Sequence, residues 1–352
     1  MKKAIFFTLT LSLITAAIFS QSEDWQNPMV YGINKMKAHA TMYSFPTEEL
    51  ALRGERENSP WFQLLDGNWK FNYAPNPKDR PLNFYRDNFD ASSWPSIKVP
   101  GNWELQGYGH PIYINWDYPW EPAIPPFIPH DQSEDMHQSN PVGSYLHSFN
   151  IPPDWNGRKI VLHFGGVSSA FYVWVNGQKV GYSQDSRLPS EFDITHLVKT
   201  GTNNLAVEVY RWCDGSYLED QDHWRLSGIH REVYLHALPQ SYIEDVFVKT
   251  NLDESYTDAT LKVQPRFFFR DKDAVAGWTI QAQLYDENLK AVLADPLKLG
   301  VEEITDFNTK GRYNNPHGDP VFPTMEASVP NVKQWSAEYP NLYPLMVSLR
   351  DA

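Results

Sequence analysis

The sequence predicts an all-β protein that folds as two successive sandwiches. Short runs of alternating apolar and polar residues, which are typical of half-buried strands, recur along most of the 352 residues. The 27 prolines oppose long helices because proline removes a backbone donor. The aromatic content of 14 % suits either a β-rich core or a surface that stacks on sugar rings.

The first element, residues 1–20, has the features of a secretory signal peptide. Lys2 and Lys3 precede an apolar run over 4–19, and a polar stretch begins at Gln21. The run is marginal for a membrane span, which needs about 20 apolar residues. We therefore expect an exported protein, periplasmic or secreted, whose mature chain begins at Gln21 and has no membrane span.

The second element, residues 21–238, is predicted to be one sandwich of the jelly-roll type. Asn176-Gly177 lies between two alternating runs, and this dipeptide favours a two-residue hairpin because both turn positions take a positive φ. A short turn at 192–197 is the closest approach to a helix. The predicted strands cover residues 67–73, 145–151, 159–164, 170–175, 178–182, 203–210 and 232–238.

The third element, residues 239–352, is predicted to be an immunoglobulin-like sandwich. Pro239 cannot continue a strand ladder, and a new alternating pattern begins at Ile243. The predicted strands cover residues 246–248, 259–263, 279–285 and 345–349.

Charge and cysteine content exclude several function classes. The 30 basic and 43 acidic residues give a net charge of −13, and an acidic surface repels the phosphates of nucleic acids. The single cysteine, Cys213, excludes an internal disulfide and any multi-cysteine metal site. The sequence also has no glycine-rich phosphate loop, paired-histidine zinc motif or serine-esterase elbow.

Three predicted loops, 113–120, 181–187 and 211–225, collect the polar and aromatic residues. Carboxylates bind sugar hydroxyls or hard cations, and tryptophan faces stack on pyranose rings. The alternative is that these are solvated loops, in which the acids cap turns and pair with nearby arginines. Glu219 and Asp222 could form a glycosidase pair, although their spacing does not require it.

Several long motifs resemble the large β-galactosidases of glycoside hydrolase family 2. The resemblance extends from Asp24 to Ala352 and implies an N-terminal jelly-roll sugar-binding domain of the galactose-binding-like class, followed by an immunoglobulin-like domain. The motifs are QDSRLPSEFD at 184–193, DGSYLEDQD at 214–222, WSAE at 335–338 and PNLY at 340–343.

The resemblance also implies which residues of this chain act on substrate and metal. Asn115 and Asp222 match substrate contacts, and Asp222 also matches a sodium ligand. A magnesium site away from the catalytic centre would involve Asp24, Asn27, Gln184 and Asp214. Sodium and magnesium are thus the cofactors implied for the complete enzyme.

In this family a TIM barrel follows and supplies both catalytic glutamates, whereas this sequence is truncated before the barrel. We therefore expect no catalysis from the 352 residues alone, and a C-terminally incomplete second sandwich that is the weaker half.

Three interpretations remain open. The chain is the N-terminal part of a β-galactosidase that hydrolyses terminal β-D-galactose residues, an exported carbohydrate-binding module without catalysis, or a partner that docks to a separate barrel. The expected partners are galactose or a β-galactoside, the barrel in cis or in trans, and further copies of the chain in a homo-oligomer of the complete enzyme.

Overall fold

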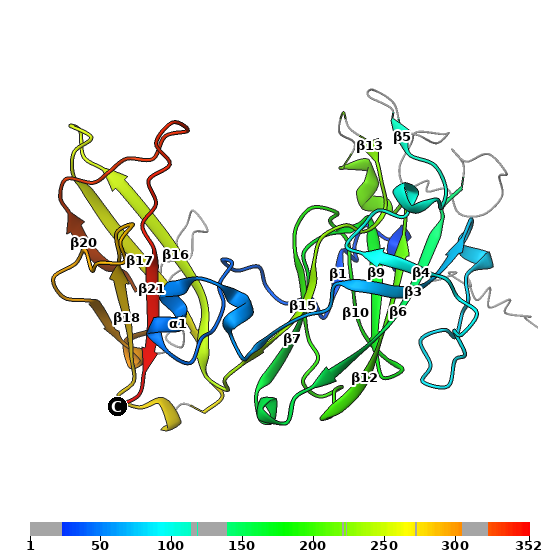
Figure 1. Cartoon of the computed structure of the whole chain (residues 1–352), viewed down its shortest axis with the longest axis horizontal. Helices are drawn as coiled ribbons and strands as arrows, with labels where there is room; N and C mark the ends of the chain where they lie inside the picture. The colour runs from blue at the N-terminus through cyan, green and yellow to red at the C-terminus, as the bar shows by residue number, and fades with distance from the viewer. Residues whose placement is uncertain are drawn as a thin grey trace, which may run out of the picture.

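The computed structural model describes residues 23–113, 118, 139–219, 222, 224–271, 273–304 and 323–352. These residues form an all-β structure of two sandwiches, as Figure 1 shows, and the predicted fold class is confirmed. No helix in these ranges is long and apolar enough to cross a membrane. The predicted signal peptide lies outside the described residues.

The first sandwich consists of a large sheet that packs against a smaller one. The large sheet has the order β1-β10-β9-β12-β6-β3-β4, and the facing sheet has the order β11-β7-β15-β2. The strands of the large sheet are β1 (Gly32–Ile33), β3 (Gly67–Ala74), β4 (Ser96–Val99), β6 (Val142–Ile151), β9 (Ala170–Val175), β10 (Gln178–Ser183) and β12 (Gly201–Tyr210). The facing sheet contains β2 (Phe62–Leu64), β7 (Lys159–Phe164), β11 (Ser190–Asp193) and β15 (Val233–Leu238).

Two short ladders extend the first sandwich at its loop end. The β5 strand (Ile112–Tyr113) pairs with β13 (Trp224–Arg225), and β8 (Val167–Ser168) pairs with β14 (Gly228–Ile229). Figure 1 shows β5 and β13 together at one end of this sandwich, beyond the ends of the long strands.

The core of the first sandwich is aromatic. Trp69 and Trp103 have no solvent-exposed surface, and the rings of Phe71 and Tyr145 pack 4.7 Å apart. The alternating pattern produces this core because every second side chain of a strand points to the same face.

The second sandwich also has two sheets. Their orders are β16-β17-β20 and β19-β18-β21. The strands are β16 (Tyr242–Leu252), β17 (Ala259–Phe268), β18 (Thr279–Leu284), β19 (Leu297–Gly300), β20 (Met325–Val329) and β21 (Leu345–Arg350).

The predicted hairpin at Asn176-Gly177 is confirmed, with φ values of 49° and 77°. The predicted turn over 192–197 is wrong at its start, because Phe192 belongs to β11 and pairs with Leu162 of β7. The sequence also gave no signal for α1 (Glu48–Arg53), because six residues are too few to show a helical period. Short 3₁₀ helices lie at Asp24–Gln26, Arg56–Asn58, Pro77–Asp79, Glu104–Gln106, Pro153–Trp155, Asp214–Tyr217 and Asp273–Val275.

Candidate functional site

The short ladder between β13 and β5 brings together an acid and two aromatic rings. Trp224 pairs with Tyr113 in this ladder, and their ring centroids lie 5.6 Å apart. The Tyr113 hydroxyl donates a hydrogen bond of 2.5 Å to Oδ1 of Asp222, and this bond raises the pKa of Tyr113. Trp224 and Tyr113 remain 57 % and 50 % exposed, so this cluster presents a carboxylate and two aromatic faces to solvent.

The strand β12 and a buried asparagine hold the loop that carries this cluster. Asn140 is fully buried, and its side chain bonds the backbone of Trp212 twice, at 3.0 Å to the carbonyl and 2.9 Å from the N–H. The backbone N–H of Cys213 then donates to the Ser216 hydroxyl at 3.0 Å, which closes the first turn of the loop. These bonds hold the first residues of the loop in one conformation. The exposed residues later in the loop are therefore attached to a rigid segment.

An arginine with a buried side chain connects the loop to the strands beneath it. The Arg211 Nη2 atom donates to the carbonyl of His110 at 3.0 Å and to that of Arg225 at 3.2 Å. Glu104 lies 3.8 Å from Nη1 of the same guanidinium and accepts from the backbone N–H of Ser227 at 2.9 Å. Burial raises the pKa of Glu104 and lowers that of Arg211, because both charged forms lose hydration.

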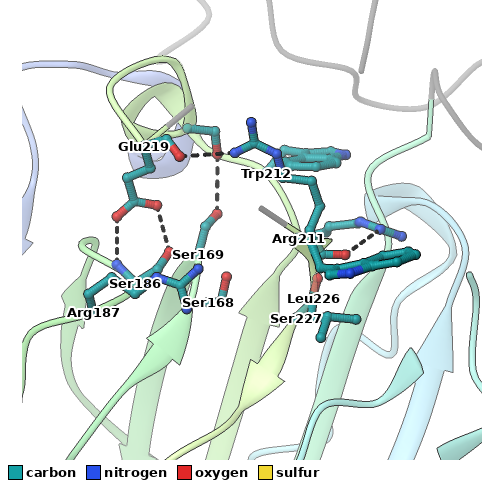
Figure 2. Close-up of a pocket in the computed structure, with 12 residues that line it drawn as sticks. Ser168, Ser169, Ser186, Arg187, Arg211, Trp212, Glu219, Leu226 and Ser227 are labelled. Carbon is teal, nitrogen blue, oxygen red and sulfur yellow. Dashed lines mark hydrogen bonds between the residues drawn. The ribbon is translucent and has the colours of Figure 1, made fainter. Parts of the chain in front are cut away.

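Glu219 has a structural role rather than a place at the exposed surface. Its two carboxylate oxygens accept from the backbone N–H and the hydroxyl of Ser186, both at 2.6 Å, as Figure 2 shows. These bonds tie the predicted loop 181–187 to the loop 211–225. Glu219 therefore fits the alternative interpretation, in which the acids of these loops cap turns.

The cavity beneath the loop is too small for a sugar. It has a volume of about 30 Å³, which accommodates water but not a pyranose ring, and its lining includes Arg211, Glu219 and Ser227. At this end of the first sandwich, the open cluster of Asp222, Tyr113 and Trp224 is the surface with room for a larger ligand.

The four residues named for magnesium each have hydrogen-bond partners in the structure. Gln184 donates to Oδ1 of Asp214 at 2.6 Å, so these two lie together, and burial raises the pKa of Asp214. Asp24 instead accepts from the Tyr172 hydroxyl at 3.1 Å and lies 3.5 Å from Lys179 Nζ. The Asn27 side chain accepts from the backbone N–H of Met29. Within the described part of the chain, no group of three or more His, Cys, Asp or Glu side chains is arranged to hold a metal ion.

Of the two residues predicted to contact substrate, Asp222 lies in the exposed cluster and Asn115 lies outside the described residues. The sequence placed Tyr113 and Trp224 in separate loops and gave no sign that they meet.

The structure also reveals a buried acid that the sequence did not single out, Glu191, whose carboxylate faces three histidines. Histidines 39, 163 and 236 are too far apart in the sequence to form a readable motif.

Comparisons with known proteins match both sandwiches. Residues 62–239 match the family described as "Glycosyl hydrolases family 2, sugar binding domain", and residues 241–352 match "Glycosyl hydrolases family 2". The chain is 40 % identical over 333 residues to a protein named beta-galactosidase from Priestia megaterium, and 42 % identical over 337 residues to one from Vibrio vulnificus. Each alignment covers 94 % of this chain and 30 % of the relative, so the chain spans about a third of their length.

Solved structures share the fold. A beta-glycosidase from Bacteroides vulgatus aligns with 82 % of this chain and 32 % of its own chain, with a TM-score of 0.58 and 19 % identity. A beta-glucuronidase from Bifidobacterium dentium aligns with 83 % of this chain and 46 % of its own chain, with a TM-score of 0.57 and 17 % identity.

Proposed function

The chain belongs to glycosyl hydrolase family 2, and from this premise we propose that it is the N-terminal, sugar-binding part of a β-galactosidase. The complete protein would hydrolyse terminal β-D-galactose residues of β-galactosides. Relatives named beta-galactosidase, at about 40 % identity over nearly the whole chain, support this activity.

The observation that carries the proposal is the exposed cluster of Asp222, Tyr113 and Trp224. A carboxylate accepts hydrogen bonds from sugar hydroxyls, and an aromatic face packs against the apolar side of a pyranose ring. Asp222 is fixed by the 2.5 Å bond from Tyr113 and accepts through the rest of its carboxylate. In this proposal Asn115, two residues after Tyr113 in the sequence, is a further substrate contact.

We place the catalytic carboxylates in another part of the complete protein. A retaining glycosidase needs two carboxyl groups about 5–5.5 Å apart on either side of the scissile bond. Glu219 is the other candidate near Asp222, and both of its oxygens are engaged by Ser186. The chain would therefore supply substrate-contacting loops, while a TIM barrel in cis or in trans would supply the acid/base and the nucleophile.

The donor atoms fit the proposed metals in part. Asp222 offers an exposed carboxylate of the kind that sodium binds, with its remaining ligands in the barrel. For magnesium, Gln184 and Asp214 supply adjacent oxygen-bearing side chains. Asp24 and Asn27 would supply a carboxylate and an amide oxygen, which now accept from the Tyr172 hydroxyl and the Met29 backbone N–H. A bound cation would offset the cost that burial places on the Asp214 charge.

Sugar binding and turnover by the 352-residue chain test the proposal. By saturation-transfer NMR and calorimetry we expect galactose to bind no more tightly than about 1 mM, or about −4 kcal/mol, because only part of the site is present. Asp222→Asn and Trp224→Ala should each abolish the signal. Asp295→Asn, which removes an exposed acid in the second sandwich, should leave it unchanged. A chromogenic β-galactoside should not be hydrolysed.

Two results would overturn this assignment. Galactose binding that survives both Asp222→Asn and Trp224→Ala would show that the cluster is not the site. Hydrolysis that disappears in Glu219→Gln, with the fold intact, would place catalysis in this chain. A micromolar dissociation constant without turnover would instead favour the second candidate, an exported carbohydrate-binding module, for which the same exposed aromatic pair would suffice.

We also propose that the protein is exported and that residues 1–20 are removed. Intact-mass measurement of the protein from its native cells should give a chain that begins at Gln21. A mass that includes Met1 to Ser20 would contradict the proposal.

A further inference from the structure

Residues 36–58 cross repeatedly between the two sandwiches. At the start of this segment, the Met36 N–H donates to the carbonyl of Glu191 in the first sandwich at 2.8 Å. The Ala40 N–H then donates to Oδ1 of Asp245 in the second sandwich, also at 2.8 Å. Figure 1 shows this part of the chain in blue, between the two sandwiches.

The later part of the segment continues this alternation. The ring of Tyr43 packs against Phe62 and Tyr234 of the first sandwich, at centroid distances of 5.8 and 6.0 Å. The α1 helix then lies against β21 of the second sandwich, where Glu48 bonds Ser348 and pairs with Arg350. The segment ends at the first sandwich, where the Arg56 guanidinium pairs with both carboxylate oxygens of Glu232, at 2.6 and 2.5 Å.

The direct connection between the sandwiches is short. The β15 strand ends at Leu238 and β16 begins at Tyr242, so three residues join them. The Lys159 ammonium bonds the Tyr242 hydroxyl at 3.0 Å beside this link. A groove of about 1000 Å³ lies between the sandwiches, and residues 36–52 form much of its wall together with β16 and β21. The segment is therefore well placed to limit rotation about the link.

His39 is the titratable residue at the centre of this arrangement. Its Nε2 atom lies 2.6 Å from Oε2 of Glu191, and its Nδ1 atom lies 2.8 Å from the carbonyl of Ala40. Both neighbours are acceptors, and a neutral imidazole donates from one nitrogen only, so the geometry requires the doubly protonated ring. In agreement, the hydrogen bond to Glu191 raises the pKa of His39 to about 9, although burial alone would lower it.

The charged groups around His39 come from both sandwiches. Glu191 of β11 is also bonded by His163 of β7 at 2.8 Å and lies 3.6 Å from His236 of β15. From the second sandwich, Asp245 of β16 faces the segment. It is paired at 2.6 Å with Arg266 of β17, which also donates to the carbonyl of Ala38 at 3.3 Å.

We propose that residues 36–58 form a strap that fixes the angle between the two sandwiches, and that loss of the His39 proton releases the strap. Once neutral, His39 can donate to only one of its two acceptors, and its bond to Glu191 loses the attraction between opposite charges. The central anchor of the segment between Met36 and Tyr43 on the first sandwich is then weakened from an ion pair to at most a neutral hydrogen bond, while Ala38 and Ala40 remain held by the second.

The sign of the pH dependence follows from the raised pKa. A group whose folded pKa lies above its ordinary value of 6.5 stabilises the structure fully below that value. The stabilisation is lost as the pH rises through about 9. The strap should therefore be closed at neutral pH and open in alkali.

Distance measurement between two spin labels tests the proposal on the full chain. The labels would be attached at Asn88→Cys in the first sandwich and Lys298→Cys in the second, both exposed positions, while the native Cys213 is buried. We expect one narrow distance distribution at pH 7 that broadens with a midpoint near pH 9. His39→Gln should be broad already at pH 7, and His39→Arg, which keeps its charge in alkali, should stay narrow above that midpoint.

Two further variants separate the strap from general loosening. Asp245→Ala removes the anchor on the second sandwich and should broaden the distribution at pH 7 without changing the Glu191 cluster. Glu49→Gln breaks an exposed ion pair within α1 and should have no effect. A narrow distribution in both His39→Gln and Asp245→Ala, or alkaline broadening that persists in His39→Arg, would overturn the proposal. Circular dichroism of each variant confirms that both sandwiches remain folded.

Discussion

A methyl group added at Gly143 should destabilise the first sandwich. Gly143 lies in the middle of the large sheet, where β6 pairs it with Val209 of β12 and Tyr73 of β3. A Cβ atom there would lie 2.6 and 2.8 Å from two ring atoms of Trp103, and 2.9 Å from a ring atom of Phe71. Both rings are fully buried, so neither can move aside without disturbing the core.

The expected cost of Gly143→Ala is about 1–3 kcal/mol, the usual penalty for overpacking a well-packed core. For a domain of this size each kcal/mol lowers the melting temperature by about 2–4 °C. Urea unfolding followed by tryptophan fluorescence measures the loss, because most of the tryptophans lie in the first sandwich.

Gly32→Ala is the matched control. Gly32 lies at the edge of the same sheet, and a Cβ atom there would meet nothing closer than 3.5 Å, from the Lys35 side chain. Its free energy of unfolding should stay within about 0.5 kcal/mol of the wild type. If Gly143→Ala changed the free energy of unfolding as little as Gly32→Ala, the result would contradict the tight packing of Trp103 and Phe71 against β6.

Three other predictions concern titration, reactivity and local stability. Glu191→Gln should cost about 3–5 kcal/mol at pH 7, because it removes the negative partner of a buried charge pair. Burial would raise the pKa of Glu191, but its bonds to histidines lower it below 4.5. The ionised carboxylate therefore stabilises the fold above pH 4.5, and this stabilisation is lost as the pH falls. The free energy of unfolding of the variant, measured by urea titration, should lack this acid dependence. Burial raises the pKa of Cys213 to about 12, so a thiol reagent at pH 8 should react only at the rate of unfolding, and fast reaction of the native protein would contradict the buried position. Hydrogen exchange should be faster in β21, a half-buried edge strand, than in β6 and β12 at the centre of the large sheet; equal protection would refute the prediction that the second sandwich is the weaker half.

The strands of six or more residues were predictable because their signal is local. Residues 170–175 are mostly aromatic and β-branched, which favours a strand, and Asn176-Gly177 indicates the turn that follows. The shorter strands, β11 among them, were not predicted, since two to five residues are too few to establish a period. The same limit explains why α1 was not predicted.

The candidate site was predictable only in part. Asp222 was named because its motif resembles a known family, and a motif carries residue identity without geometry. Nothing local distinguished Asp222 from Glu219, although one is exposed beside two aromatic rings and the other is engaged by Ser186.

The sequence by itself determined the β class, the order of the strands along the chain and the family resemblance, because these depend on neighbouring residues. The tertiary structure alone decided which distant residues meet. Tyr113 and Asp222 are 109 residues apart, His39 and Glu191 are 152 apart, and Ala40 and Asp245 are 205 apart. Such contacts depend on the order of strands within the sheets and on the path of the chain between the sandwiches, which no local pattern encodes.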